Sequence, residues 1–487
     1  MARELLGNIK GQKGDKGEKG DKGDKGDPGI DISNDEVIQA RGNYPILKDR
    51  LDITDSQLGQ IVDSVDSDLS DIRNTLSQTY LLDKLYSVLN LFNMPSGFPM
   101  TTPFTVYTSL SGKVVLDYDV SVNKNSVNKR YYVDVNNGVN SNDGSETTPF
   151  KTLERAFRYG DADEIILKAG IYDWSNGTVG TVPISNQKKT FNLIGEGDVY
   201  LGAHRGYQTW TLVEGQSNVY HTSVSSVIEV IDIRNYSSPL FYEKMNSISE
   251  VAGKSGAYYI NGSDVYVRTT NNAKPNEKIL LNMNNNALQL DDFENIYMEN
   301  IKFTNTFTMF NTNTLCRLYA KNCDFMFGTG DNTVSIWGEV YSIFQNCRAM
   351  YAERDGFNYH VRKGKLPRGI EIDCIGAYNG RDGGNSNNGS TIHDGGTILR
   401  INGEYHHNHG PNIIDVNLGT KSLNIGVYSH HSTATTSLSN VDFRTRDDVD
   451  MWLVNCISNG SDFSTSVEGN ANLYKENSLL IGKEFVG

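Results

Sequence analysis

The stretch RAMYAERDG at residues 348–356 returns as IGAYNGRDG at residues 375–383, with Tyr, Arg, Asp and Gly in the same places 27 residues apart. The same spacing reaches NGEYHHNHG (402–410), and shorter intervals add KNCDFMFGTGDN (321–332) and IGVYSHHS (425–432). Repeats of about 20 to 30 residues, in which equivalent residues of successive coils stack on one another, are typical of a solenoid. The sequence therefore predicts rungs that lie about 4.8 Å apart, as strands do in a sheet.

Alignment of the repeats predicts two columns of stacked side chains. The aromatic column is Phe327, Tyr351, Tyr378, Tyr405 and Tyr428. Four residues before its first three members stand Cys323, Cys347 and Cys374. Free cysteine packs as a small hydrophobe, so these three residues predict a buried thiol ladder. The five cysteines include no CxxC pair, which argues against a disulfide scaffold and against a zinc-finger-like site.

Composition excludes several functional classes. The 487 residues carry 45 Lys and Arg against 59 Asp and Glu, a net charge of −14, and this balance argues against a nucleic-acid partner. No window approaches the roughly 18 apolar residues of a membrane span, and the start MARELLGNIKG lacks the apolar core of a secretory signal. The 47 Gly and 51 Asn tolerate the left-handed backbone of tight turns, so many turns are expected.

The N-terminal region has a strict triplet pattern. Glycine occupies every third position from Gly11 to Gly29, which makes seven triplets. Only glycine fits the crowded axis of a collagen triple helix, so residues 11–31 predict a collagen-like segment where three chains meet. The alternative is a flexible charged linker. So short a tract would barely hold a triple helix by itself, so a second segment must supply trimerisation.

That second segment is a predicted coiled coil over residues 32–94. Apolar residues recur every seven positions, at Leu51, Leu58, Val65 and Ile72. A second apolar run continues out of register to Phe92, and Pro95 would end the helix. Proline and glycine then punctuate residues 95–130, which we interpret as a connector or short β collar.

The region that follows has a family resemblance. The runs YYVDVNNGVNSNDGSETTPFKTLERAF (131–157) and IILKAGIYD (165–173) resemble the opening of right-handed parallel β-helices of the pectate-lyase-like superfamily. The resemblance implies that a short helix caps the solenoid and that the KAGIY strand begins the first coil, but it implies nothing about chemistry. The expected fold is mainly β: a trimeric fibre with a collagen-like triple helix, an α-helical coiled coil and a right-handed parallel β-helix (131–487).

The repeat alignment also identifies candidate catalytic residues. Four residues after successive aromatic residues it places Asp355, Asp382 and His409. If the rungs stack as the repeat implies, the two carboxylates lie about one strand spacing apart, and a separation of about 5 to 5.5 Å suits a retaining glycosidase. Two carboxylates and a histidine could equally hold a divalent cation. Asp-Gly and His-Gly are also ordinary turn dipeptides, so these residues could serve only to form the turns between strands.

Candidate ligand-binding residues cluster in the same region. Seven of the nine histidines fall between residues 360 and 431, together with a basic loop (360–369) and a long polar loop (379–396). Such loops are commonly functional, and the alternative is a solvated loop between rungs. The candidates are Arg354, Arg381, His360, Arg362, Lys363, His393, Asp394, Tyr378 and Tyr405. The basic members could dock anionic groups in a chain that is otherwise acidic.

The modular layout has its own resemblance. The start LLGNIKGQKGDKGEKGDKG (5–23), the junction ARGNYPILKDRLD (40–52) and the series of stalk and β-helix resemble tail fibres, tailspikes and appendages of phages of Gram-positive bacteria. The resemblance implies a homotrimer on the virion that faces the host wall, with residues 1–10 attached to other tail or collar proteins. It also implies a β-helix that binds, or degrades, a cell-wall glycan or teichoic acid.

Two functions stay open at this point. In the first, the β-helix is a glycan or teichoic acid hydrolase that uses Asp355, Asp382 and His409. In the second, the chain is a non-enzymatic structural or adhesive fibre. No cofactor is predicted apart from the divalent cation named above. Because an open solenoid end is a liability, we also expect a further domain or a partner over the last rung.

Overall fold

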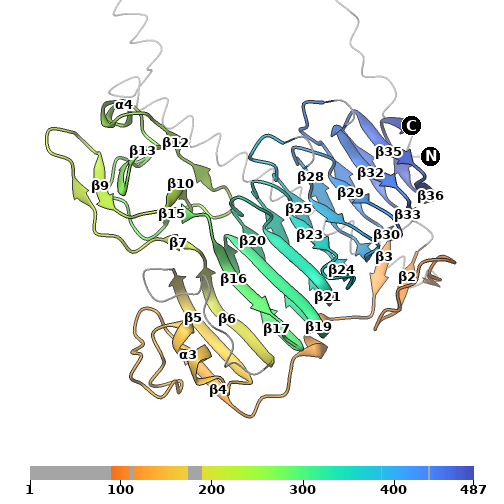
Figure 1. Ribbon diagram of the computed structural model, residues 1–487, viewed down its shortest axis with the longest axis horizontal. Coiled ribbons are helices and arrows are strands. Elements are labelled where there is room, and N and C mark those ends of the chain that lie inside the picture. The colour runs from red at the N-terminus through yellow and green to blue at the C-terminus, as the bar shows by residue number, and fades with distance from the viewer. Residues whose placement is uncertain (1–88, 110–112, 174–188, 385–386, 437–438) are drawn as a thin grey trace, which may run out of the picture. The chain divides into compact units, whose positions relative to one another are not determined.

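The computed structural model describes residues 89–487, with gaps at 110–112, 174–188, 385–386 and 437–438. This part of the chain is mainly β and winds into a parallel β-solenoid of about 12 turns. Figure 1 shows the solenoid strands side by side in chain order. The predicted attachment segment and collagen-like tract, and the coiled coil as far as residue 88, lie outside the described residues.

The first coils form as the sequence indicated. Strand β4 (Arg130–Val133) pairs in parallel with β5 (Glu164–Tyr172), which pairs with β6 (Thr190–Leu201). Helix α3 (Leu153–Tyr159) lies between β4 and β5 in the chain and packs its apolar residues into the solenoid core. The Thr152 hydroxyl accepts a hydrogen bond from the Arg155 amide at its start, and Gly160 ends it with a φ of 74°. The expected capping helix and first strand are confirmed.

From residue 286 onward, successive coils add strands to three parallel columns. The first column contains β17 (Asn295–Glu299), the ends of β19 (Thr306–Lys321) and β21 (Val334–Gln345), β24 (Arg368–Ile372), β27 (Thr397–Ile401), β30 (Thr420–Ile425), β33 (Val449–Val454) and β36 (Asn472–Glu476). The second contains β18 (Lys302–Thr304), β20 (Asp324–Met326), β22 (Arg348–Met350), β25 (Ile375–Ala377), β28 (Glu404–His406), β31 (Tyr428–His430), β34 (Ile457–Asn459) and β37 (Leu479–Leu480). The third contains β16 (Asn286–Asp291), the starts of β19 and β21, β23 (Phe357–His360), β26 (Ser390–Ile392), β29 (Ile413–Val416), β32 (Val441–Asp447), β35 (Phe463–Gly469) and β38 (Lys483–Val486).

A left-handed residue turns each coil from the first column into the second. These residues are Asn300, Asn322, Asn346, Asp373, Asn402, Gly426, Asn455 and Asn477, with φ between 48° and 65°. Asn, Asp and Gly are the residues that tolerate this conformation, which explains part of the asparagine surplus. The next residue points inward, and at three consecutive rungs it is Cys323, Cys347 and Cys374. All five cysteines are buried and free, so the predicted thiol ladder is confirmed.

The aromatic column differs from the predicted one after its third member. Its residues are Phe327, Tyr351, Tyr378, His407 and His431, all with φ between 52° and 66°. Neighbouring rings stack at centroid distances of 5.9, 5.3, 5.1 and 5.5 Å. Tyr405 and Tyr428 are not members, because Ile375 pairs with Glu404, and Glu404 with Tyr428. The step from Tyr378 to His407 is two residues longer than the repeat alignment assumed.

An insertion interrupts the solenoid between β6 and β16, and the repeat analysis did not anticipate it. One antiparallel sheet contains β7 (His204–Arg205), β10 (Val227–Asp232), β11 (Leu240–Phe241) and β15 (Ile279–Met283). The other contains β8 (Thr211–Leu212), β9 (Tyr220–Ser223), β12 (Glu243–Lys244), β13 (Ala257–Asn261) and β14 (Asp264–Arg268), with helix α4 (Ile248–Gly253) beside it. The two sheets share an apolar core around Trp210, Val230 and Val265.

The segment before the solenoid packs on its outer surface. Strands β1 (Asn90–Leu91), β2 (Val106–Thr108) and β3 (Val114–Leu116) form an antiparallel sheet, and a 3-10 turn (Val120–Asn123) follows. Their apolar side chains lie against outward residues of the first column, such as Leu399 and Trp452. The predicted helix does not reach Phe92, because Asn90 and Leu91 pair with β2 in extended conformation.

The later rungs enclose a buried polar network. The Arg400 guanidinium donates to both oxygens of Asp415 at 2.8 and 2.9 Å, and both side chains are 0% exposed. Glu371 accepts hydrogen bonds from the hydroxyls of Tyr359, Ser390 and Tyr405. Burial raises the pKa of Glu371, and the Arg400 charge and these donors oppose the rise. Tyr405 is therefore a core residue, and its predicted role in ligand binding is wrong.

Candidate functional site

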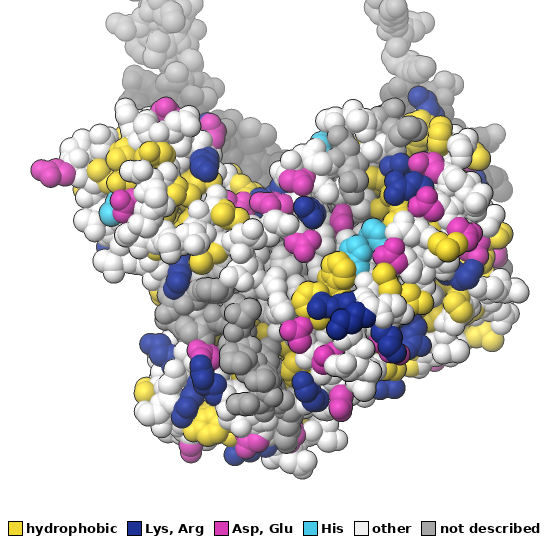
Figure 2. Space-filling view, viewed as in Figure 1, with side chains coloured by type: hydrophobic (Ala, Val, Ile, Leu, Met, Phe, Trp, Pro, Cys, Tyr) yellow, Lys and Arg dark blue, Asp and Glu magenta, His cyan; other side chains and the backbone are white. Residues whose placement is uncertain are grey.

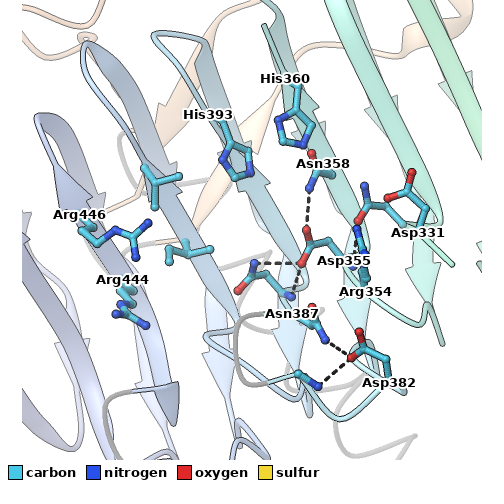
Figure 3. A pocket seen from close by; sticks show the side chains of 15 residues that line it. Asp331, Arg354, Asp355, Asn358, His360, Asp382, Asn387, His393, Arg444 and Arg446 are labelled. Atoms are coloured by element: carbon cyan, nitrogen blue, oxygen red, sulfur yellow. Dashed lines mark hydrogen bonds between the residues drawn. The ribbon is translucent and has the colours of Figure 1, made fainter.

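A cavity of about 460 Å³ opens on the outward face of the third column (Figure 3). Its floor lies on strands β23, β26, β29 and β32, which pair in register. One row of lining side chains crosses these strands as His360, His393, Val416 and Arg446. Three strand spacings make this row about 14 Å long. The cavity therefore suits an extended ligand that lies across the rungs.

Asp355 lies in the wall of this cavity, just before β23. Its Oδ1 accepts hydrogen bonds from the backbone and side-chain amides of Asn388 at 2.8 and 3.0 Å, and its Oδ2 accepts one from Asn358 at 2.6 Å. Burial raises the pKa of the carboxyl group to about 6, although these donors favour the charged form. Asp355 can therefore exchange a proton near neutral pH, as a general acid must.

Asp382 lines the same cavity but is not the equivalent of Asp355 in the next coil. Phe357 pairs with Ser390, so the residue beside Asp355 is Asn388. Asp382 lies in the exposed turn after β25, where its Oδ1 accepts hydrogen bonds from Gly384 and Asn387. The predicted stacking of the two carboxylates is wrong, because the segment between β25 and β26 is longer than that between β22 and β23.

Charged groups gather at both ends of the cavity. Figure 3 shows Asp331, Arg354 and Asp382 at one end and Arg444 and Arg446 at the other. Burial raises the pKa of Asp331, and a backbone hydrogen bond and the charge of Arg354 oppose the rise. Arg444 pairs with Glu468 at 2.8 Å, whereas the more exposed Arg446 lies 3.5 Å from Asp447. The second end could therefore receive an anionic group.

The two predicted histidines of this cavity belong to a ring stack. The ring of His360 lies 4.2 Å from that of Trp337 and 4.3 Å from that of His393. Burial and the neighbouring His393 together lower the pKa of His360 to about 4, against the opposing charge of Asp394. Burial also lowers the pKa of His393. Both imidazoles are therefore neutral at neutral pH and can exchange hydrogen bonds with ligand hydroxyl groups.

Three other predicted residues lie at a separate cavity of about 440 Å³, lined in part by Tyr378, Arg381 and His409. The Arg381 guanidinium donates to Glu229 of the insertion at 2.7 Å and lies over the ring of Phe241. Arg381 therefore holds the insertion against the solenoid. His409 does not line the cavity of Asp355 and Asp382, so the predicted catalytic column does not form.

The remaining predicted binding residues are dispersed. Arg362 lies over the ring of Phe310 at 3.8 Å. Lys363 is exposed in a turn with a φ of 50°. Asp394 accepts a hydrogen bond from Asn417. These three residues do not line the cavity that holds Asp355.

Sequence reasoning missed several residues that shape the cavity. Arg444 and Arg446 escaped notice, although the alternation in VDFRTRD (441–447) places both on one face of a strand. Asn387 and Asn388 were part of the polar loop, where no pattern distinguishes the residues that contact carboxylates. The signal for the arginines was therefore present, and the signal for the asparagines was not.

The predicted cation ligands Asp355, Asp382 and His409 do not come together. Within the described residues, the side chains that converge closely enough to hold a metal ion are Glu404, His406 and His430. Figure 2 shows histidine, basic and acidic side chains intermixed over the later rungs, without a broad patch of one sign. No helix of the described part is long and apolar enough to cross a membrane.

Comparisons with known proteins show a likeness of fold only. No family model and no curated protein matches this chain. A glycoside hydrolase structure is 9% identical and covers 72% of this chain and 97% of its own, with a TM-score of 0.46. A pectate lyase is 11% identical over 73% and 80%, with a TM-score of 0.34. The tailspike of Acinetobacter baumannii bacteriophage AP22, in complex with capsular saccharide, is 12% identical over 66% and 65%, with a TM-score of 0.23. These likenesses concern backbone shape alone.

Proposed function

We propose that the chain is a receptor-binding protein of a phage tail or appendage, and that its cavity binds an anionic cell-wall glycan of the teichoic acid class. The observation that carries the proposal is the cavity across β23 to β32, in which two histidines and two arginines lie on either side of Ile414 and Val416. The triplet and heptad patterns of the N-terminal region support an elongated trimer on the virion.

The chemistry of the cavity matches such a polymer. Arginine guanidinium groups bind phosphate through paired, charge-assisted hydrogen bonds, which suits Arg446 and Arg444 at one end. Asn358 and the neutral imidazoles of His360 and His393 suit hydroxyl groups of sugar or polyol units between the charges. The cavity is about 14 Å long across the strands, so it would hold several linked units rather than one small molecule.

A hydrolytic activity would centre on Asp355. Its raised pKa, about 6, gives a proton donor at the pH of most host environments. Asp331 and Asp382 line the same cavity, and either could supply the second carboxylate that glycoside hydrolysis requires. His409 is not part of this arrangement.

A non-enzymatic, adhesive role is the second candidate. It is favoured by the three hydrogen bonds that Asn358 and Asn388 donate to Asp355. A carboxylate held in this way can serve as the anchor of a turn without any chemistry. In that case the polymer would bind in the same cavity and remain intact.

Titration of the full chain with purified wall teichoic acid tests the proposal. We expect the variant with Arg354→Gln and Arg446→Gln to bind at least tenfold more weakly than wild type, because both guanidinium groups lie at the cavity. Arg158→Gln is the matched control, because Arg158 does not line the cavity and pairs with Glu154 on helix α3. Equal affinity of wild type and the double variant would contradict the proposal. The chain length of the bound polymer, followed on the same samples, separates hydrolysis from adhesion.

A further inference from the structure

A second cluster of side chains lies on the second column, outside the cavity described above. Strands β28 and β31 pair in parallel, with Glu404 opposite Tyr428 and His406 opposite His430. Glu404 and His406 are two residues apart on one strand, so their side chains project from the same face. His430 projects from that face on the neighbouring strand. Two adjacent strands thus present one carboxylate and two imidazoles together.

The geometry points to a binding site for one divalent transition-metal ion, and we propose that Glu404, His406 and His430 are its ligands. Their nearest ligand atoms all lie within 4.8 Å of one another. Glu404 Oε1 is 2.9 Å from His430 Nε2 and 4.0 Å from His406 Nε2. Zinc bonds of about 2.0 to 2.1 Å in a tetrahedron place ligand atoms about 3.4 Å apart. The rings of His406 and His430 stack at 4.8 Å with planes 10° apart, so ion binding must turn at least one ring until both Nε2 atoms face the ion.

The choice of ion follows from the donor atoms. Two imidazoles and one carboxylate are the ligands of open Zn²⁺ sites, which keep a fourth position for water or a ligand atom. Ca²⁺ and Mg²⁺ prefer sets of oxygen ligands. The site is also open to solvent at one side, because the Glu404 side chain is 43% exposed while His406 and His430 are 13% and 11% exposed.

Two further histidines form an outer layer behind the proposed ligands. His406 Nδ1 lies 2.8 Å from His407 Nδ1, and His430 Nδ1 lies 2.8 Å from His431 Nδ1. A histidine that binds a metal through Nε2 donates its Nδ1 hydrogen to a second group, which fixes its ring. His407 and His431 provide that acceptor at two successive rungs. The ring pairs are perpendicular, at 88° in both cases.

His406 and His430 also stack on each other, at 4.8 Å, but the ring column of the earlier coils does not explain why both are histidines. The column of left-handed residues accounts for rings at His407 and His431, since Tyr351 and Tyr378 hold the same place in earlier coils. It does not account for histidines at 406 and 430, where Met350 and Ala377 stand in the preceding rungs. The change to histidine coincides with the rung where Glu404 stands between the two imidazoles.

Equilibrium dialysis of the metal-stripped, full-length chain against Zn²⁺ tests the inference, with a purification tag that contains no histidine. Bound metal is counted by mass spectrometry, and Co²⁺ absorption reports the ligand geometry. We expect Glu404→Gln and His406→Gln each to lower the affinity of one Zn²⁺ site per chain at least tenfold. Ca²⁺ and Mg²⁺ at the same concentrations should not displace the Zn²⁺.

His221→Gln is the matched control, because His221 Nε2 and Asp264 Oδ1 form a similar pair at 3.0 Å that has no third ligand among the described residues. It should bind Zn²⁺ as wild type does. Glu404→Gln keeps the shape of the side chain and a hydrogen bond to His430, so this variant should remain folded. If His406→Gln does not fold, Zn²⁺ binding by Glu404→Gln alone tests the inference. Equal Zn²⁺ binding by wild type and Glu404→Gln, or no Zn²⁺ binding by wild type, would overturn the inference. The result does not depend on the proposed glycan function.

Discussion

The Asn388 backbone and side-chain amides both donate hydrogen bonds to Asp355 Oδ1, at 2.8 and 3.0 Å, across two neighbouring coils. Asp355 therefore has an amide beside it on the next coil, where the repeat alignment expected the carboxylate of Asp382. Its raised pKa comes mainly from burial, with a smaller contribution from the charge of Asp331 and none from Asp382. This relationship defines how the cavity should respond to mutation and to pH.

In the proposed hydrolytic reaction, the protonated form of Asp355 is the general acid. We expect any cleavage rate to fall as the pH rises through about 6, because the carboxyl group then loses its proton. Asp355→Asn should reduce the rate by about 100-fold or more, the usual contribution of a general acid. A rate assay from pH 4.5 to 8 checks both expectations. A variant that cleaves at the wild-type rate would remove Asp355 from the mechanism.

Asp442 should make the stability of the chain depend on pH. It is wholly buried, and burial raises its pKa to about 7, although Ser458, Ser461 and Asn412 donate hydrogen bonds to it. A carboxyl group with a raised folded-state pKa contributes stability that is fully present below its unfolded-state pKa, near 3.8, and is lost as the pH rises to about 7. Urea unfolding of wild type at pH 5 and pH 8 should show the loss.

The Asp442→Asn variant is the control for that dependence. Asparagine does not titrate, so the free energy of unfolding should change less between pH 5 and pH 8 than in wild type. The serine hydroxyls can rotate to accept hydrogen bonds from the new amide, so the buried polar groups keep their hydrogen-bond partners. An unchanged pH dependence in the variant would assign the effect to other groups.

The buried pair of Arg400 and Asp415 should be sensitive to removal of one partner. Arg400→Met leaves the Asp415 carboxylate buried without its cation, which typically destabilises a protein by about 3 to 5 kcal/mol. Lys321→Met breaks the exposed pair with Asp119 and should cost less than about 1 kcal/mol. Chemical denaturation of the two variants compares them directly. Similar losses would mean that the interior tolerates the unpaired carboxylate.

The five cysteines should resist thiol reagents in the folded chain. All are buried, and burial raises the pKa of Cys316 and of Cys456 to about 12. Thiolate is the reactive form, so labelling should be negligible until the protein unfolds. Titration with a chromogenic disulfide reagent, with and without denaturant, counts the reactive thiols. Rapid labelling of native protein would contradict the packed thiol ladder.

The fold could be predicted from the sequence because its turns impose strict local requirements. A coil that needs a left-handed residue selects Asn, Asp or Gly, and the inward position after it selects a small apolar residue. This requirement is met by the pairs Asn322-Cys323, Asn346-Cys347 and Asn455-Cys456. Asn402 and Gly426 fill the same left-handed position in two other rungs, so an alignment anchored on this position would have placed His407 and His431 in the ring column.

The site could be predicted only in part, because loops between rungs vary in length without disturbing the strands. The repeat alignment treated the segment after Tyr378 as equivalent to that after Tyr351, although it carries additional residues before β26. That difference moved Asp382 away from the place beside Asp355 and moved His409 to another cavity. The insertion between β6 and β16 was missed for a related reason, since it forms two mostly antiparallel sheets that share no period with the coils.

The structure of the chain with a bound teichoic acid oligomer tests the central claim most directly. We expect the oligomer to lie across β23, β26, β29 and β32, with a phosphate group within hydrogen-bond distance of Arg444 or Arg446 and a sugar or polyol unit beside Asp355. An oligomer bound elsewhere on the solenoid, with the cavity left to solvent at saturating concentration, would contradict the claim.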